Sequence, residues 1–418
     1  MIEMRLISKR CGVINPLSIE DYIKADGYKA LAKALKTDTI KLIEEIHKSK
    51  LRGRGGAGFP VATKVIALAK EINEEKFVIC NADEGEPGNF KDRYLMENDP
   101  HQILEGMLIV AYQTRATKGY IYIRGEYHHS HNTMQWAIDE ARKLNYLGTN
   151  ILNSGFDFDI EIRSGAGSYV CGEEFALIES IEGKPGRTRV KPPFPTTQGL
   201  YNKPTLINNV ETFSNIPLII TIGGDQFAKI GTKSSTGTKL ICLSGNVKNK
   251  GVFEVPFGVS IRDVIEKLGS GVDNDRKLKM VQLGGACGPI IPDYMLDMLI
   301  DYDRFEEFES KTGAGAIIVI DERFDIFDIL TRVVRFFEHE SCGKCTPCRE
   351  GNQQLLKILE RFQEHTATVK DLVSLESLAR VMHQTSLCGL GQTSPTAIIS
   401  TLRYFRDDYI DRLDSLEI

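Results

Sequence analysis

Hydrophobic and polar positions follow three different patterns along the chain, and these patterns predict three zones. In residues 1–228, helical stretches alternate with short apolar runs. The runs at 76–80, 119–124 and 156–163 predict strands. Alternating helices and strands are typical of an α/β layer fold, so we expect the first domain to be of this class.

The second zone, residues 229–323, predicts a small α+β module. Apolar runs at 238–244 and 252–256 flank a turn and indicate a hairpin. Ser260 is suited to cap a short helix that ends at Gly269, and the run at 316–320 supplies a further strand.

The third zone, residues 324–418, predicts a helical bundle, because its apolar residues recur at helical spacing. The recurring positions are Ile326, Ile329, Leu330, Val333, Val334, Leu355, Leu356, Ile358, Leu359, Leu372, Leu375 and Leu378.

Composition narrows the possible partners. The 418 residues are 42% hydrophobic and 26% charged, with a net charge of -5, so nothing indicates a nucleic-acid surface. No run approaches the roughly twenty apolar residues of a membrane span, and the N-terminus lacks the apolar core of a signal peptide. We therefore expect a cytoplasmic protein without direct membrane insertion.

Four of the nine cysteines form a metal-site pattern, with Cys342, Cys345 and Cys348 at two-residue gaps and Cys388 forty residues later. Three closely spaced thiolates and a distant fourth suit a [4Fe-4S] cluster held between a helix end and an interhelical loop. Zinc is the alternative, although zinc sites usually combine two Cys-x-x-Cys pairs. The other five, Cys11, Cys80, Cys171, Cys242 and Cys287, lack the spacing of a disulfide framework. Most of them, Cys287 included, are expected to be reduced and buried thiols.

A glycine-rich loop spans residues 52–60, with four glycines in six positions. Bare backbone of this kind approaches a phosphate or a ring closely, and a helix starting after Pro60 would add its dipole and bring Lys64 near. A Rossmann dinucleotide loop is disfavoured, because the residues before it are helical rather than strand-like. A flexible linker is the alternative, but flexible linkers lack the Arg, Phe and Pro residues that this loop contains.

Three polar stretches, 81–88, 165–174 and 208–212, follow apolar runs. Each alone is consistent with a capped turn, since Asn, Asp and Gly are ordinary turn residues. Open α/β sheets bind ligands outside the carboxyl ends of their strands, so three such loops together indicate a flavin or nucleotide pocket.

These motifs, in this order along nearly the whole chain, resemble the NADH-binding flavoprotein subunit of respiratory complex I. The same module serves soluble NAD(P)-linked hydrogenases and formate dehydrogenases. The resemblance implies FMN in the first domain, a β-grasp (ubiquitin-like) middle module and a C-terminal helical bundle with a [4Fe-4S] cluster.

Carried over by motif, the resemblance implies two sets of binding residues. For FMN they are Gly53, Gly55, Lys64, Asn81, Asp83, Glu84, Tyr169, Gly172, Glu173, Asn208, Asn209 and Thr212. For NADH they are Phe59, Glu86, Glu174, Lys191 and Phe194. The aromatic rings suit stacking, and Glu86 would accept from a ribose hydroxyl while repelling a 2′-phosphate, which favours NADH over NADPH.

The resemblance also implies the chemistry, which is hydride transfer from NADH to FMN without a protein acid or base. Electrons would then pass singly to the cluster of Cys342, Cys345, Cys348 and Cys388. Lys344 and Arg349 would raise the potential of that cluster, or are solvated surface charges.

The expected multisubunit complex is inferred from the motif around Cys388 and from cluster-binding cysteines that this chain does not contain. Residues 388–395 look more like the soluble branch, in which larger members add thioredoxin-like and ferredoxin-like cluster domains. This chain has neither set of cysteines, so a thioredoxin-like [2Fe-2S] subunit and the iron–sulfur catalytic subunit of a hydrogenase or formate dehydrogenase are the expected partners. The peripheral arm of complex I is the alternative assembly. Rival classes are a scaffold without flavin and a flavoenzyme that uses a quinone rather than NADH.

Overall fold

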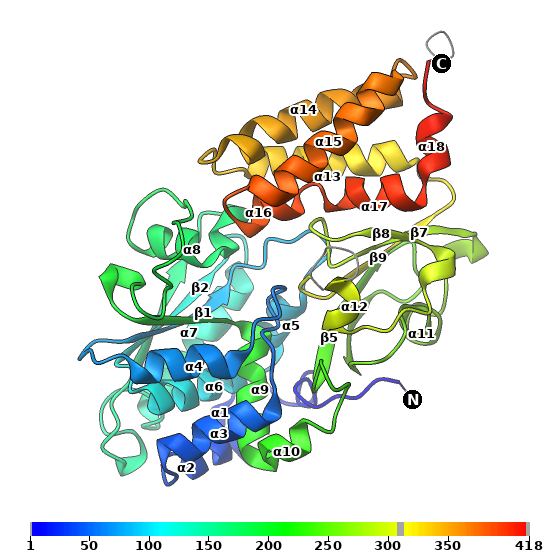
Figure 1. The fold of residues 1–418 in the computed structure, drawn as a ribbon. Helices are drawn as coiled ribbons and strands as arrows, with labels where there is room; N and C mark the ends of the chain where they lie inside the picture. Colours follow the sequence, from blue (N-terminus) through cyan, green and yellow to red (C-terminus); the bar gives the residue numbers. More distant parts are fainter. Residues whose placement is uncertain (1, 307–312, 415–418) are drawn as a thin grey trace. The chain divides into compact units, whose positions relative to one another are not determined.

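The computed structural model describes residues 2–306 and 313–414 (Figure 1). The chain divides into two compact units, and each is described by itself. The first comprises residues 1–85, 90–240 and 254–258, and the second comprises residues 86–89, 241–253 and 259–418. Within the described residues, no helix is both long enough and apolar enough to cross a membrane.

The first unit is built on a four-stranded sheet in the order β3-β2-β1-β4, with every pairing parallel. Its strands are β1 Phe77–Ala82, β2 Lys118–Ile123, β3 Asp159–Ser164 and β4 Thr205–Asn209. The three predicted strands are confirmed to within a few residues. The fourth, β4, was not predicted as a strand, because five residues are too few to establish a pattern of hydrophobic and polar positions.

Helices flank this sheet, as a parallel sheet requires. They are α1 Ile19–Lys24, α2 Lys29–Ala34, α3 Thr39–Ser49, α4 Val61–Lys70, α5 Lys91–Asn98, α6 Pro100–Thr114, α7 His128–Lys143, α8 Glu174–Ile181, α9 Val210–Ile222 and α10 Gly224–Phe227. Helix α6 is buried along almost its whole length and packs closely on α9. The α/β class predicted for this part of the chain is therefore confirmed.

The N-terminal segment is fastened to α6 by buried polar groups. Glu105 accepts from the Tyr22 hydroxyl at 2.5 Å and from the backbone N–H groups of Tyr28 and Leu31 at 3.0 and 2.9 Å. The hydroxyl of Tyr28 lies 2.9 Å from His101 Nδ1. Because it is buried, His101 has a pKa lowered to about 3.

We expect His101 to make the stability of the first unit depend on pH. An unfolded chain binds a proton at histidine below about pH 6.5 while the native state does not, so native stability is lost as pH falls from 6.5 toward 3. The loss is about 2 kcal/mol at pH 5 relative to pH 7.5. Urea unfolding at the two pH values should show that the wild type loses about 2 kcal/mol more stability than His101→Asn, because the difference between the two proteins isolates His101 from carboxyls such as Glu84 that titrate in the same range. The exposed His129→Asn is the control, and an unchanged slope in His101→Asn would contradict the prediction.

A second sheet, most of which belongs to the second unit, is mixed and has the order β6-β5-β9-β7-β8, in which β5 and β9 are parallel and β7 and β9 are antiparallel. Its strands are β5 Thr238–Gly245, β6 Gly251–Pro256, β7 Leu278–Leu283, β8 Ile290–Pro292 and β9 Ala316–Asp321. The adjacent strands β5 and β6 and the strand β9 match the predicted runs. Strands β7 and β8 were missed, because glycines surround them and β8 has only three residues.

The predicted helix after Ser260 begins as expected, since the Ser260 hydroxyl accepts from the N–H of Asp263. Helix α11 Ile261–Asp263 then widens into a π-helical turn, Val264–Leu268, before Gly269. A small helix α12 Tyr302–Glu306 follows β8 along the chain.

The rest of the second unit is helical, as the spacing of apolar residues predicts. The helices are α13 Ile326–Glu340, α14 Thr346–Gln363, α15 Val369–Thr385, α16 Gly389–Thr393, α17 Thr396–Tyr404 and α18 Arg406–Ile410. Helix α14 packs between α13 and α15, and α15 packs on α17. Phe327 and Phe362 stack at 5.2 Å between ring centroids, and Tyr409 meets both edge-on.

Candidate functional site

The carboxyl ends of the four parallel strands lie at one edge of the first sheet. Of the predicted polar loops, one follows β1, one follows β3, and the third contains the end of β4 and the start of α9. The strand order reverses between β1 and β4, because the chain moves outward to β2 and β3 before returning to the other side of β1. Such a reversal opens the crevice in which open α/β sheets bind ligands.

The glycine-rich loop is a closed, ordered turn rather than a linker. The backbone of Arg52 pairs with that of Pro60, and the Gly53 N–H donates to the Phe59 carbonyl at 2.8 Å. Helix α3 precedes the loop and α4 follows it, which confirms the helical context inferred from sequence. The Arg54 N–H donates to Thr212 Oγ1 at 2.8 Å, so the loop is fastened beside the end of β4.

Side chains tie the four loops together. Asn81 Nδ2 donates to the Gly172 carbonyl at 2.8 Å, which joins the loops after β1 and β3. Asn209 Nδ2 lies 3.4 Å from the Asn81 carbonyl, and a Cβ on Gly55 would lie 3.1 Å from Asn209 Cβ. All twelve residues predicted to bind FMN belong to the first unit, and these contacts bring their loops together.

Asn208 in β4 and Lys64, which reaches β4 from α4, are suited to bind a polar ring system. Asn208 is buried, and its Nδ2 finds no hydrogen-bond partner among the described residues. Burying an amide N–H unpaired costs about 1–3 kcal/mol, so an acceptor such as a flavin carbonyl is the natural complement. Lys64 reaches back from α4 to donate to the Ile207 carbonyl at 3.0 Å, and burial lowers its pKa.

The Glu84 carboxyl is held at the N-terminus of α5. It accepts from the backbone N–H groups of Asp92 and Arg93, both at 3.0 Å, and Tyr127 Oη lies 3.3 Å away. Burial and the neighbouring Asp92 raise the pKa of Glu84 to about 7. A carboxyl poised near neutrality matches the hydroxyls and ring nitrogens expected as its partners better than it matches a phosphate.

The residues predicted to bind NADH include a group beside α8. Lys191 Nζ contacts Glu174 Oε1 at 2.5 Å and Glu173 Oε1 at 3.1 Å, and Glu173 also caps α8. Phe59 and Phe194 are 49% and 56% exposed, so both rings are accessible for stacking.

Glu86, the remaining NADH candidate, belongs to the second unit. Its Oε1 accepts from the Cys287 N–H at 2.9 Å, in the turn between β7 and β8. Gly285 has a φ of +89°, and a Cβ there would lie 2.4 Å from Glu86 Cγ. The glycine-rich turn therefore holds the Glu86 carboxylate by its backbone. Cys287, expected to be a buried thiol, is only half-buried.

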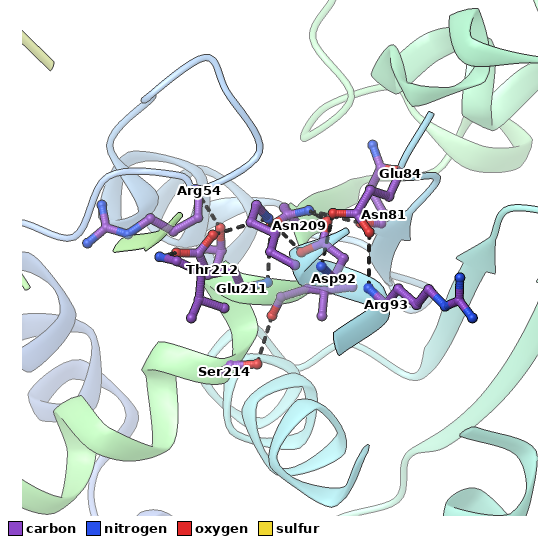
Figure 2. Close-up of polar contacts among 12 residues, drawn as sticks. Arg54, Asn81, Glu84, Asp92, Arg93, Asn209, Glu211, Thr212 and Ser214 are labelled. Atoms are coloured by element: carbon purple, nitrogen blue, oxygen red, sulfur yellow. Dashed lines mark hydrogen bonds and ion pairs between the residues drawn. The ribbon is translucent and has the colours of Figure 1, made fainter. Parts of the chain in front are cut away.

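Sequence reasoning missed a set of buried charges behind the predicted flavin loops, comprising Lys91, Asp92, Glu211 and Lys239. Figure 2 labels Asp92 and Glu211 of this set. All four side chains are at most 4% exposed. A signal was present, because Lys239 interrupts an apolar strand and therefore required a buried partner.

The four cysteines of the metal-site pattern lie around the ends of helices. Cys342 follows α13, Cys345 precedes α14, Cys348 is in the first turn of α14, and Cys388 precedes α16. The positions match the predicted helix end and interhelical loop. None of the four cysteines forms a disulfide in the part of the chain that the structure describes.

Cys348 is the most enclosed of the four. The Ser341 hydroxyl lies 3.3 Å from its Sγ, and Asn352 Nδ2 lies 3.6 Å from the same atom. Burial, with added repulsion from the other three cysteines, raises the pKa of Cys348 to about 11.

The two candidate metals require different spacings of their four thiolates. Among the described residues, no group of three or more His, Cys, Asp and Glu side chains is placed to hold a single metal ion. Four thiolates around one zinc must meet at about 2.3 Å from a common centre. A [4Fe-4S] cluster keeps its four thiolates farther apart, because the irons and sulfides lie between them.

Arg349 does not act on the sulfurs as an uncompensated charge. It pairs with Glu350 at 2.8 Å and donates to the Gly343 carbonyl at 2.7 Å, while its side chain is 44% exposed. Lys344 is also exposed. Both observations favour surface charges over a role in raising the cluster potential.

A parallel sheet with ligand loops at its switch point, and a separate four-cysteine site at helix ends, define a flavin- and cluster-carrying electron-transfer protein. The comparisons with known families agree. Residues 46–218 match the Nuo51 FMN-binding domain, and residues 328–412 match the NADH-ubiquinone oxidoreductase-F iron-sulfur binding region.

Alignments with known relatives extend over nearly the whole chain. It is 46% identical to the NADP-reducing hydrogenase subunit HndC of Solidesulfovibrio fructosivorans, over 99% of this chain and 84% of that protein. It is 43% identical to an NADH-quinone oxidoreductase subunit of Rhizobium meliloti, over 95% of this chain and 94% of that protein. An NAD⁺-reducing [NiFe]-hydrogenase crystal structure superposes with a TM-score of 0.85 at 35% identity, over 99% of this chain and 67% of that chain.

The chain therefore belongs to the family of NADH-binding flavoprotein subunits shared by complex I and soluble hydrogenases. It is an NADH oxidoreductase subunit, and its cofactors are FMN, NAD(H) and a [4Fe-4S] cluster.

Proposed function

We propose that this chain is the electron-input or electron-output subunit of a soluble NAD-linked hydrogenase or formate dehydrogenase. The observation that carries the proposal is the convergence of four loops at the switch point of the first sheet, on a chain that also places four cysteines around helix ends. When bound, FMN exchanges a hydride with NAD(H) and single electrons with the [4Fe-4S] cluster.

The protein's own residues would bind and orient in this reaction. We assign the twelve predicted FMN residues to flavin binding, with no protein acid or base acting on the hydride. Lys191, Glu174, Phe59, Phe194 and Glu86 are assigned to NADH. Support comes from two exposed rings, a lysine poised between two carboxylates, and a Glu86 carboxylate fixed by backbone.

We propose three functional domains, with an FMN domain at 1–228, a β-grasp module at 229–323 and a helical bundle holding the cluster at 324–418. The two family matches fall inside the first and third ranges. The order of the second sheet, with a parallel β5–β9 pair and a helix between β6 and β7, supports the β-grasp assignment.

The partners proposed are a thioredoxin-like [2Fe-2S] subunit and the iron–sulfur catalytic subunit of the enzyme. The 46% identity to a hydrogenase subunit supports this branch. The 43% identity to a subunit of NADH-quinone oxidoreductase keeps the peripheral arm of complex I as the second candidate. No disulfide joins the nine cysteines among the described residues, which fits the reducing cytoplasm as the proposed location.

Anaerobic absorbance of the purified chain with its thioredoxin-like partner, before and after NADH and then NADPH, tests the proposal. Bleaching of the flavin and cluster bands by NADH alone supports it. A spectrum without flavin after reconstitution would leave only a scaffold, and bleaching by NADPH as well would remove the role assigned to Glu86.

We expect Glu86→Gln to weaken the discrimination against NADPH. The substitution removes a negative charge proposed to face the 2′-phosphate, while the amide oxygen still accepts from the Cys287 N–H. A repulsion of about 1–2 kcal/mol corresponds to a tenfold gain in kcat/KM for NADPH relative to NADH. Steady-state diaphorase assays measure the ratio, with the exposed Glu20→Gln as the charge-matched control. An unchanged ratio would exclude Glu86 as the discriminating residue.

A further inference from the structure

Four charged side chains of the first unit, Lys91, Asp92, Glu211 and Lys239, form a group that we call the buried charge cluster. Glu211 Oε2 accepts from Lys239 Nζ at 2.5 Å and from Lys91 Nζ at 3.1 Å, and its Oε1 accepts from the Leu240 N–H at 2.9 Å. Lys91 Nζ also contacts Asp92 Oδ1 at 2.6 Å. Two cations and two anions are thus fully paired away from water.

Burying such a cluster is expensive, and a well-packed apolar group of the same volume is often equally stable or more so. The cluster is therefore better explained by what it holds in place. None of its four members is among the residues assigned to FMN or NADH, yet it contacts two loops that carry them.

The first contact is to the end of β4. Lys91 Nζ donates to Asn209 Oδ1 at 3.1 Å. Asn209 Nδ2 in turn donates to Asp92 Oδ2 at 2.6 Å (Figure 2). The same Asn209 oxygen accepts from the Glu211 N–H at 3.0 Å and caps α9. A cation on its oxygen and an anion on its nitrogen fix the orientation of this amide, because the flipped amide would face both charges with the wrong atom.

The second contact is to the loop after β1. The backbone N–H groups of Asp92 and Arg93 hold both oxygens of Glu84 at 3.0 Å. The position of this first turn of α5 depends on Lys91 and Asp92 being anchored to Glu211 and Asn209. One cluster therefore sets the geometry of two residues from different parts of the sheet edge, Glu84 in the loop after β1 and Asn209 at the end of β4.

We propose that Lys91 is a positioning residue for the flavin, acting through Asn209 and Glu84 without touching the cofactor. The inference rests on the proposed assignment of those two residues to the FMN site. The three donors of the Lys91 ammonium are matched by contacts to Asp92, Glu211 and Asn209, which leaves none for a ligand.

A second consequence concerns charge. The cluster is neutral as a whole, so removing Lys91 leaves a net negative charge close to the proposed flavin site. Reduction of a flavin adds negative charge, which an additional buried anion disfavours. The midpoint potential of the flavin should therefore fall when Lys91 is neutralised.

The test compares Lys91→Met with Lys76→Met in the full chain. Lys76 is also a buried lysine of the first unit, but it donates to the backbone carbonyls of Leu68 and Thr114, neither of which is assigned to the flavin. FMN affinity is measured from the fluorescence of released FMN, the flavin midpoint potential by anaerobic titration, and folding by circular dichroism and iron content.

The expected result is an FMN Kd raised about 10- to 100-fold in Lys91→Met, the range typical when the outer partners of a ligand-holding residue are removed. The flavin potential should also be lower, and Lys76→Met should match the wild type in both. A folded Lys91→Met with a Kd within about twofold of wild type and an unshifted potential would overturn the inference.

Two further variants keep the test decisive. If Lys91→Met does not fold, Lys91→Met/Asp92→Asn removes one cation and one anion together and leaves Glu211 paired with Lys239. Unchanged FMN affinity in that double variant would equally overturn the inference. Asn209→Ala distinguishes a failure of the proposed FMN site from a failure of the role of Lys91. Unchanged FMN affinity in Asn209→Ala contradicts the assignment of the FMN site itself. Weakened affinity in Asn209→Ala with normal affinity in Lys91→Met contradicts only the role of Lys91.

Discussion

Cys348→Ser is expected to abolish the iron–sulfur cluster while leaving FMN in place. Each corner of a [4Fe-4S] cluster needs one protein thiolate, and a serine oxygen is a much poorer ligand for iron. Cys348 is also the most buried of the four thiols, so its surroundings restrict the entry of a replacement ligand. Iron and sulfide analysis should fall from about four atoms per chain to less than about one. FMN should remain, because its predicted residues belong to the other compact unit.

The matched control is Cys242→Ala, which removes a buried thiol in β5 that lies outside the four-cysteine pattern. Its iron content should equal that of the wild type. Full iron retained in Cys348→Ser, or an equal loss in Cys242→Ala, would contradict the assignment of the cluster ligands.

Gly106→Ala is expected to destabilise the first unit by about 3 kcal/mol or more, although alanine has the better helix propensity by about 1 kcal/mol. A Cβ on Gly106 in α6 would lie 2.1 Å from the carbonyl oxygen of Phe213 in α9. Backbone cannot rotate aside, so the two helices must separate. Urea unfolding measures the loss of stability.

The same substitution should weaken FMN binding, because Phe213 adjoins Thr212, which fastens the glycine-rich loop through the Arg54 N–H. Gly351→Ala in α14 provides the contrast. There the added Cβ would meet the flexible Met382 side chain at 2.4 Å, which can shift, so the expected cost is below about 1 kcal/mol. Equal stability losses in the two variants would show that helix contact is not the cause.

Local sequence patterns predicted much of the fold because they depend on near neighbours. The runs at 76–80 and 119–124 became β1 and β2, and the helical spacing after residue 324 became α13 to α15. The short strands β4 and β8 escaped prediction, since five and three residues cannot establish a period against surrounding glycines and turns. The π-helical turn after Asp263 also gave no sequence signal.

The residues of the candidate site could likewise be predicted from the sequence only in part. Spacing alone indicated a metal site, because Cys342, Cys345 and Cys348 are only three residues apart in turn and are near one another in any fold. Cys388 was added as the distant fourth ligand of the pattern. The roles of Glu84 and Asn209 followed only from resemblance and remain predictions. Lys91 was not singled out, since a lysine at the start of a helix gives no hint of burial.

The sequence by itself determined the class of the first domain and the helical character of the last, because both rest on local periodicity. Its motifs indicated the family, and the spacing of its cysteines predicted the cluster ligands. Only the tertiary structure decided that four loops meet where the strand order reverses, that Cys287 holds Glu86, and that Lys91, Asp92, Glu211 and Lys239 pair behind the flavin loops. The longer contacts among them join Glu211 to Lys239, 28 positions apart along the chain, and Glu86 to Cys287, 201 positions apart. Burial alone makes such pairings obligatory, since a charge removed from water must find its counter-charge wherever the fold brings one.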